Sequence, residues 1–586
     1  KYGLAKKRLK LLSLIQYTVL GVPCIYYGDE AGLEGCEDPF NRAPFPWDSP
    51  DLELTEHYRA LAKLRAHSKL LLSGDFSPLG LSDNVFSFTR RGSNEEIVIL
   101  INRSVSVLEK VSLNTKAGYV LELLSSEELL PQNGKLSLEL LPLSSKVLYF
   151  MDNPPEYTEL KRSAGVLCHI SSVPARRADG ASLQDIFDFI DFLARSGQKL
   201  WQVLPLNPAG KGSSPYLSPA LFALDSVPKC KNDFSDDAYL EFCRNNNFWL
   251  DDYALYMALM DVYGGAWQKW PERERDRLDV DDLKNTHKAS AEKYKRLQFL
   301  LERSWLRIKE YANDRSISII GDIPIYASPG GADAWANREI FRLNEKGYAP
   351  LHAGVPPDCF SSLGQDWGNP LYDWEGNPDS VFLFWERRLR RAALLHDYIR
   401  LDHFRAFSAY FAIPEGKTPS DGEWLCGPGP DFLTEMRKRL GKFPVIAEDL
   451  GKLDASVCNL IKLSGSPGMN VWQFSASEME NMTKKSASHR IFYSGTHDNP
   501  TLLSFCADSF PDKSPESEAM AVVEKLYRSE APWVIIPLQD LLLLSDDSRM
   551  NTHGIAEGNW KWRADGASLT ADLSNRLKKL ALDNKR

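Results

Sequence analysis

Short apolar runs recur along the C-terminal three quarters of the chain, and segments with helical spacing of apolar residues separate them. The runs lie at residues 165–171, 199–206, 318–326, 398–404, 444–450, 469–474 and 491–499. Runs of this length are typical of strands that are buried on both faces of a parallel sheet. Their alternation with helices predicts an α/β fold, most economically a (β/α)8 barrel with a helical insertion at residues 249–312.

The pattern changes in the first 151 residues. Residues 1–73 predict helix, strand, loop and helix, with a buried strand at Val22–Tyr27 because an apolar run lies between two glycines. Residues 74–151 contain short strands between turn residues, which predicts a small antiparallel β-sandwich. A proline pair marks residues 152–161 as a linker, so residues 162–586 are expected to form the barrel.

Composition narrows the class of protein. Of the 586 residues, 43% are hydrophobic and 25% are charged, as in ordinary globular proteins. The formal charge of −9 disfavours a nucleic-acid partner or an anionic membrane. Polar residues interrupt the apolar segment Leu11–Cys24, so it is too short for a membrane span. The nine cysteines have no metal-binding spacing, which fits reduced thiols in the cytoplasm.

Three of the predicted strands end in a carboxylate followed by polar residues. Asp402 follows Arg400, Glu448 ends the next strand, and Asp498 follows His497. The C-terminal strand ends of a barrel form one active-site face. Retaining cleavage of a glycosidic bond needs a nucleophilic carboxylate and an acid/base carboxyl about 5–5.5 Å apart. Acidic residues also end strands and cap helices for structural reasons, but three together favour glycosidic chemistry.

Aromatic residues supply surfaces that could stack on sugar rings. They make up 11% of the chain, and several lie in loops rich in glycine and proline. These loops contain Ser214–Tyr216, Gln365–Asn369 and Glu557–Trp560. Aromatic residues are more often part of a core, but loops on a rigid scaffold commonly carry binding residues.

Several long motifs are similar to those of a known family. SGQKLWQVLPL, GDIPIY, AGVPPDCFSSLGQDWGNPLYDW, IRLDHFRAF, VIAEDLG, GTHDN and RMNTHGIAEGNWKWR occur in this order. Together they resemble the 4-α-glucanotransferases, also called amylomaltases or disproportionating enzymes, of glycoside hydrolase family 77. The resemblance extends from about residue 162 to residue 563.

The resemblance implies a role for each matching residue. Asp402 would be the nucleophile, Glu448 the acid/base and Asp498 the stabiliser of the transition state, while Arg400 and His497 would hold sugar hydroxyls. Further positions match the family's substrate cleft: Tyr216, Asp322, Gln365, Trp367 and Asn559. The implied reaction is transfer of α-1,4-glucan segments between maltooligosaccharides, without a metal or an organic cofactor. A hydrolase with the same carboxylates and a non-catalytic glucan-binding protein are the alternatives.

A second resemblance covers the N-terminal part. GVPCIYYGDEAGLEG and DPFNRAPFPWD resemble the end of the barrel in α-amylase-family enzymes of the neopullulanase type. This implies that residues 1–73 are a truncated barrel end and that residues 74–151 are the C-terminal sandwich of such an enzyme. The catalytic residues of that family lie upstream of this point. We therefore expect Asp29, Glu30 and Glu34 to be loop residues of an inactive part.

Overall fold

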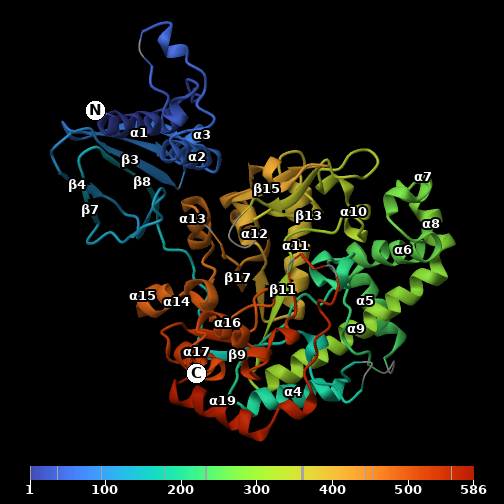
Figure 1. The fold of residues 1–586 in the computed structure, drawn as a ribbon. Helices are drawn as coiled ribbons and strands as arrows, with labels where there is room; N and C mark the ends of the chain where they lie inside the picture. Colours follow the sequence, from blue (N-terminus) through green and yellow to red (C-terminus); the bar gives the residue numbers. More distant parts are fainter. Residues whose placement is uncertain are drawn as a thin grey trace.

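An eight-stranded parallel sheet forms the centre of the larger part of the molecule (Figure 1). The computed structural model describes residues 2–586 apart from 36, 94, 178–179, 231–233, 358–361, 443, 452, 553 and 556. The strand order is β17-β14-β11-β10-β9-β20-β19-β18. In chain order these strands are β9 (Ser163–Leu167), β10 (Leu200–Gln202), β11 (Ser318–Ile323), β14 (Tyr398–Leu401), β17 (Val445–Ala447), β18 (Gly468–Val471), β19 (Arg490–Tyr493) and β20 (Trp533–Pro537). The two end strands meet where the Ala447 N–H donates to the Pro467 carbonyl over 2.9 Å, so the predicted (β/α)8 barrel is confirmed.

Helix α4 (Leu183–Arg195) shows how the sequence builds the outer layer of the barrel. The Ser182 hydroxyl accepts the Asp185 N–H, and the Asp185 carboxylate accepts the Ser182 N–H, so two otherwise free donors are satisfied. Ile186, Phe189, Ile190 and Leu193 recur at helical spacing and are buried in one core with Trp201 and Trp305. Gly197, with φ of 72°, follows the last turn and ends the helix.

A helical insertion and a second sheet extend the barrel on its active-site side. The insertion contains α6 (Asn247–Tyr263) packed along α9 (Lys288–Asp314), at the predicted position. The second sheet is antiparallel, with order β13-β12-β15-β16. Its strands are β12 (Leu351–Val355), β13 (Gln365–Pro370), β15 (Ala409–Pro414) and β16 (Glu423–Cys426). The sequence did not predict this sheet or the eighth barrel strand β20.

Residues 75–151 form a six-stranded antiparallel sheet and a two-stranded one. Strand β3 (Glu96–Asn102) shows the alternation that holds them together. Ile97, Ile99 and Ile101 pack against α1 (Tyr2–Thr18) and α2 (Leu52–Ala66). Val98 and Leu100 face the opposite way, against β4 (Glu109–Asn114) and β7 (Lys135–Leu140). The two sheets are layered as expected for a small antiparallel sandwich.

The prediction of a buried strand at Val22–Tyr27 was wrong. This segment has no strand structure, and Val22 is 92% exposed. A strand needs a neighbour to satisfy its backbone N–H and C=O groups, and none of the strands in the described ranges pairs with it. Several barrel runs also proved longer than their strands. The run 469–474, for example, changes to helix α14 (Trp472–Asn481) after Val471.

The N-terminal part lies against helix α13 (Ala455–Ser464) of the barrel (Figure 1). The Lys63 ammonium is 2.6 Å from the Asp454 carboxylate, which caps that helix. Farther along α13, the Asn459 amide donates to the Leu123 carbonyl over 2.7 Å. Among the described residues, no helix is both long enough and apolar enough to cross a bilayer.

Candidate active site

Six of the predicted site residues come from the C-terminal ends of four barrel strands. Asp322 is on β11, Arg400 is on β14 with Asp402 directly after it, and Glu448 follows β17. His497 and Asp498 lie in the loop after β19. Hydrogen bonds and ring contacts join the residues from these separate strands, as expected for the active-site face of a barrel.

Arg400 binds two of the carboxylates in this network. Its Nη1 donates to both oxygens of Asp322, over 2.8 and 2.7 Å, and its Nη2 lies 2.9 Å from Asp402 Oδ1. The Tyr216 hydroxyl donates to Asp322 Oδ2 over 2.7 Å. The side chain of Asp322 is fully buried, whereas that of Asp402 is 26% exposed. Asp322 is therefore occupied in orienting Arg400 and Tyr216, and Asp402 is the carboxylate of this group that remains accessible.

Glu448 is held by two backbone donors. Its Oε2 accepts the His403 N–H and its Oε1 accepts the Leu450 N–H, both over 2.8 Å. Burial raises the pKa of Glu448 to about 7, with the Arg400 charge opposing the shift and the Asp402 charge adding to it. A carboxyl with this pKa carries a proton for much of the time near neutral pH, so it can give one to a substrate and take it back.

Asp498 is fixed by neighbours in two loops. The Asn551 amide donates to its Oδ1 over 2.7 Å, and His497 Nε2 lies 3.2 Å from its Oδ2. The Asp498 side chain is 36% exposed. Asp498 thus adds a third carboxylate, held by His497, to the strand-end face that carries Asp402 and Glu448.

An aromatic wall stands beside these carboxylates. The Tyr216 ring stacks on the His497 ring with 4.9 Å between centroids and an interplanar angle of 11°. The Trp560 ring lies 5.8 Å from Tyr216 and 5.5 Å from His497. Trp560 lies in one of the aromatic loops that the sequence marked as candidate binding loops. The substrate-cleft position predicted in that loop was Asn559. The Asn559 side chain instead bonds its own loop, accepting the Thr552 N–H and donating to the Thr552 carbonyl, each over 3.0 Å.

Strand β13 brings Gln365 and Trp367 to the site from the second sheet. The Trp367 indole N–H donates to Gln365 Oε1 over 3.0 Å. The Trp367 ring meets the His403 ring edge-on, with centroids 4.9 Å apart and an interplanar angle of 89°. His403 is a contact residue that the sequence analysis missed, although its place directly after Asp402 was a signal that could have identified it.

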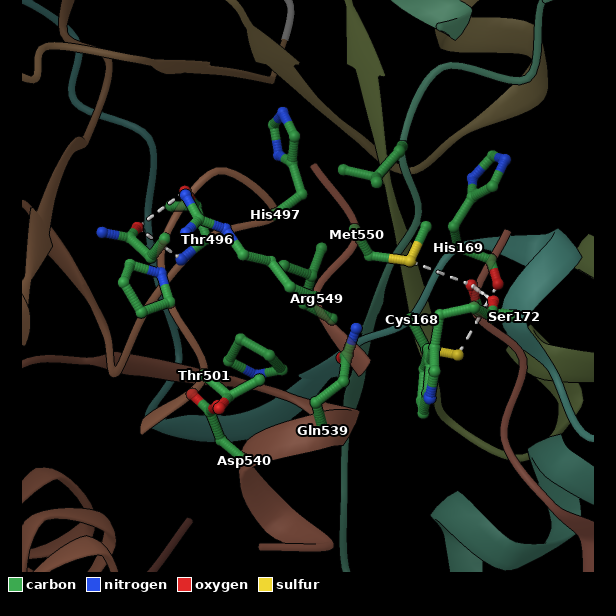
Figure 2. A pocket seen from close by; sticks show the side chains of 16 residues that line it. Cys168, His169, Ser172, Thr496, His497, Thr501, Gln539, Asp540, Arg549 and Met550 are labelled. Atoms are coloured by element: carbon green, nitrogen blue, oxygen red, sulfur yellow. Dashed lines mark hydrogen bonds between the residues drawn. The ribbon is translucent and has the colours of Figure 1, made fainter. Parts of the chain in front are cut away.

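A pocket lies beside this group, between the ends of β9, β19 and β20 (Figure 2). His169, Ser172, His497, Arg549 and Met550 line part of it. Arg549 donates from Nε to the Asn551 carbonyl over 2.8 Å, and from Nη2 to the Asp498 carbonyl. The pocket wall therefore supports the loop that carries the third carboxylate. No grouping of His, Cys, Asp or Glu side chains that could hold a metal ion occurs within the described part of the chain.

Comparisons with known proteins agree on one family. The family model described as 4-alpha-glucanotransferase matches residues 168–229 and 227–570. A 4-alpha-glucanotransferase from Synechocystis sp. is 36% identical over 491 residues, covering 71% of this chain and 96% of the relative. One from Streptococcus pneumoniae is 33% identical over 484 residues, with the same coverage of both chains. The solved structure of amylomaltase from Streptococcus agalactiae in complex with acarbose is 29% identical, has a TM-score of 0.66, and covers 73% of this chain and 100% of that one.

Proposed function

Because the chain belongs to the 4-alpha-glucanotransferase family, we propose that Asp402, Glu448 and Asp498 carry out a retaining double displacement on α-1,4-glucans. The enzyme activity itself follows from the family. The residue roles rest on the geometry of the carboxylates and on the match to the family motifs.

In the first half-reaction Glu448 gives its proton to the glycosidic oxygen as the bond to the anomeric carbon breaks. Asp402 attacks that carbon and forms a covalent glycosyl-enzyme, and the shortened glucan leaves with the proton. Arg400 supports Asp402 with a positive charge 2.9 Å away. Asp498 stabilises the positive charge that develops on the sugar ring in the transition state.

In the second half-reaction Glu448, now a carboxylate, takes the proton from the 4-hydroxyl of an acceptor glucan. The hydroxyl oxygen attacks the anomeric carbon, and the bond to Asp402 breaks. Transfer exceeds hydrolysis when a bound sugar is held in better position than water. The stacked wall of Tyr216, His497 and Trp560 supports such sugar binding.

The main support for this proposal is that two carboxyls near the same arginine have different environments. Burial raises the pKa of Glu448 to about 7, and Arg400 places its guanidinium directly against Asp402. One carboxyl is therefore suited to proton transfer and the other to nucleophilic attack. Retaining glycosidic chemistry requires one carboxyl that transfers a proton and one that attacks the anomeric carbon.

The substrates that we propose are α-1,4-glucans and maltooligosaccharides, and the acidic net charge of −9 does not favour nucleic acid. We place the enzyme in the cytoplasm, where reduced thiols persist, because the cysteines in the described ranges are free. We also propose that residues 162–586 form the transferase unit by themselves. The Synechocystis relative matches 71% of this chain but 96% of its own length.

Incubation with maltotriose tests the function. Transfer yields glucose together with chains longer than maltotriose, since each donor fragment is passed to another sugar. A hydrolase of the same mechanism yields only shorter sugars. Binding of maltotriose without any product would support the third alternative, a non-catalytic glucan-binding protein.

A further inference from the structure

We propose that His403 is a positioning residue for Glu448, which it holds through its backbone N–H rather than through its imidazole. This inference rests on the proposed role of Glu448 as the acid/base. His403 directly follows Asp402, so one short segment of backbone supports both carboxyls of the displacement.

The backbone of His403 has an uncommon conformation. Its φ and ψ are both 48°, in the left-handed region that residues with a side chain seldom adopt. The 2.8 Å hydrogen bond from its N–H to Glu448 Oε2 is made in this conformation. Residues held in sparsely populated backbone conformations are concentrated at functional sites, where the surrounding structure imposes them.

Neighbouring contacts hold this conformation in place. The Phe404 N–H donates to the Glu448 carbonyl over 3.1 Å, and the Ala406 N–H donates to the His403 carbonyl over 3.0 Å. The imidazole packs edge-on against Trp367. Trp367 in turn is fixed by its bond to Gln365. The segment from Asp402 to Ala406 is therefore tied to Glu448 on one side and to the second sheet on the other.

The imidazole is not suited to proton transfer. Its Nε2 is buried and has no hydrogen-bond partner among the residues that the structure describes. Burial, together with the Arg405 charge, lowers the pKa of His403 to about 3, so the ring is neutral at physiological pH. The ring therefore acts as a packing group, and the polar contribution of His403 comes from its backbone.

Loss of the His403 N–H would change Glu448 in two ways. The carboxyl plane would be held at only one oxygen, by Leu450. The carboxylate form would also lose a donor, which raises the pKa of Glu448. The other charged groups that act on Glu448 are Arg400 and Asp402 from β14 and its end, Asp449 from its own segment, and Arg405. A substitution at position 403 replaces none of these side chains.

The roles of the His403 N–H and of its ring can be separated by substituting residues that differ in how well they accept a left-handed backbone. His403→Asn and His403→Gly remove the imidazole but accept this conformation, whereas His403→Val strongly disfavours it. The pH dependence of kcat/KM is measured with maltotriose for each variant. In the parent enzyme kcat/KM should fall on the alkaline side of its pH profile, the alkaline limb, as Glu448 loses its proton. We expect the Asn and Gly variants to show this alkaline fall at the same pH. In the Val variant the limb should move up by about one pH unit, and the rate should fall by about tenfold to a hundredfold.

Two controls make the result decisive. Circular dichroism and the melting temperature show whether each variant folds, and His403→Ala, which disfavours the left-handed region less, replaces Val if that variant does not fold. Equal losses in all variants would overturn the proposal, because they would assign the effect to the ring; an unchanged limb in a folded Val or Ala variant would overturn it as well. Failure of the acid/base assignment has a different signature: Glu448→Gln would then be as slow with an α-glucosyl fluoride, which needs no acid, as with maltotriose.

Discussion

Two glutamates, one in each part of the molecule, are held by backbone N–H groups in the same way. In the N-terminal part, Glu122 Oε1 accepts the Val147 N–H over 2.9 Å and its Oε2 accepts the Ser125 N–H over 2.6 Å. In the barrel, Glu448 likewise accepts two backbone N–H groups, one at each oxygen. Hydrogen bonding by two backbone N–H groups therefore does not by itself distinguish a structural carboxylate from a reactive one.

The difference lies in what the two folds bring near each carboxylate. In the barrel, all strands run in parallel, so their C-terminal ends meet on one face and place Arg400 and Asp402 beside Glu448. In an antiparallel sheet, neighbouring strands end at opposite edges. Glu122 accordingly joins its own turn to the strand beside it in the sheet. Glu30, which the sequence marked as a loop residue, accepts the N–H of nearby Gly28 in the same way.

The largest effect is expected from Asp402→Asn. The amide cannot attack the anomeric carbon, so turnover of maltotriose should fall by at least about a hundredfold. Binding of maltotriose, measured by calorimetry, should largely remain because the aromatic wall is unchanged. A variant that keeps more than about a hundredth of the parent rate would remove Asp402 from the nucleophile role.

The paired variants Glu448→Gln and Glu122→Gln test the comparison directly. Glu448→Gln should lower turnover of maltotriose by about 10²–10⁴-fold, but it should still react with an α-glucosyl fluoride. Glu122→Gln should leave turnover unchanged and destabilise the fold by about 1–3 kcal/mol, because an amide NH₂ then faces a backbone donor. Thermal melts and maltotriose assays on both variants measure these effects, and a loss of turnover in folded Glu122→Gln would contradict the distinction.

The alkaline limb of the pH profile of kcat/KM should reflect the titration of Glu448. Its pKa is raised to about 7, so the protonated acid is present below that pH and is lost above it. We expect kcat/KM for maltotriose to decline above pH 7 by about tenfold for each further pH unit. Glu122→Gln should leave this alkaline limb in place. An alkaline limb that persists unchanged in Glu448→Gln would assign the titration to another group.

Removal of residues 1–155 is expected to have little effect on catalysis. The carboxylates and their partners all lie in residues 162–586, so turnover should stay within about threefold of the parent. The melting temperature should fall, because Asp454 and Asn459 lose Lys63 and the Leu123 carbonyl. The isolated N-terminal part should aggregate through Val22–Tyr27, whose apolar side chains are already exposed in the whole protein. A folded deletion variant without activity would show that the N-terminal part contributes to the cleft.

Much of the barrel and its carboxylates could be predicted from local sequence. Runs such as 318–326 and 398–404 are apolar because both faces of each strand are covered, and this requirement is visible without knowing the neighbours. The acidic residues near the ends of the strands in these runs, Asp322 and Asp402, could be identified for the same reason. The identical argument failed at Val22–Tyr27, because an apolar run becomes a strand only where another strand accepts its hydrogen bonds.

The partners of each side chain were decided by the tertiary structure. Asp322 binds Arg400 across 78 positions of the chain, His403 reaches Glu448 across 45, and Tyr216 stacks on His497 from a different loop. No local pattern encodes such pairs. The sequence by itself determined which carboxylates stand at strand ends. Only closure of the barrel decided that Glu448 is desolvated beside Asp402, which is the physical origin of its raised pKa.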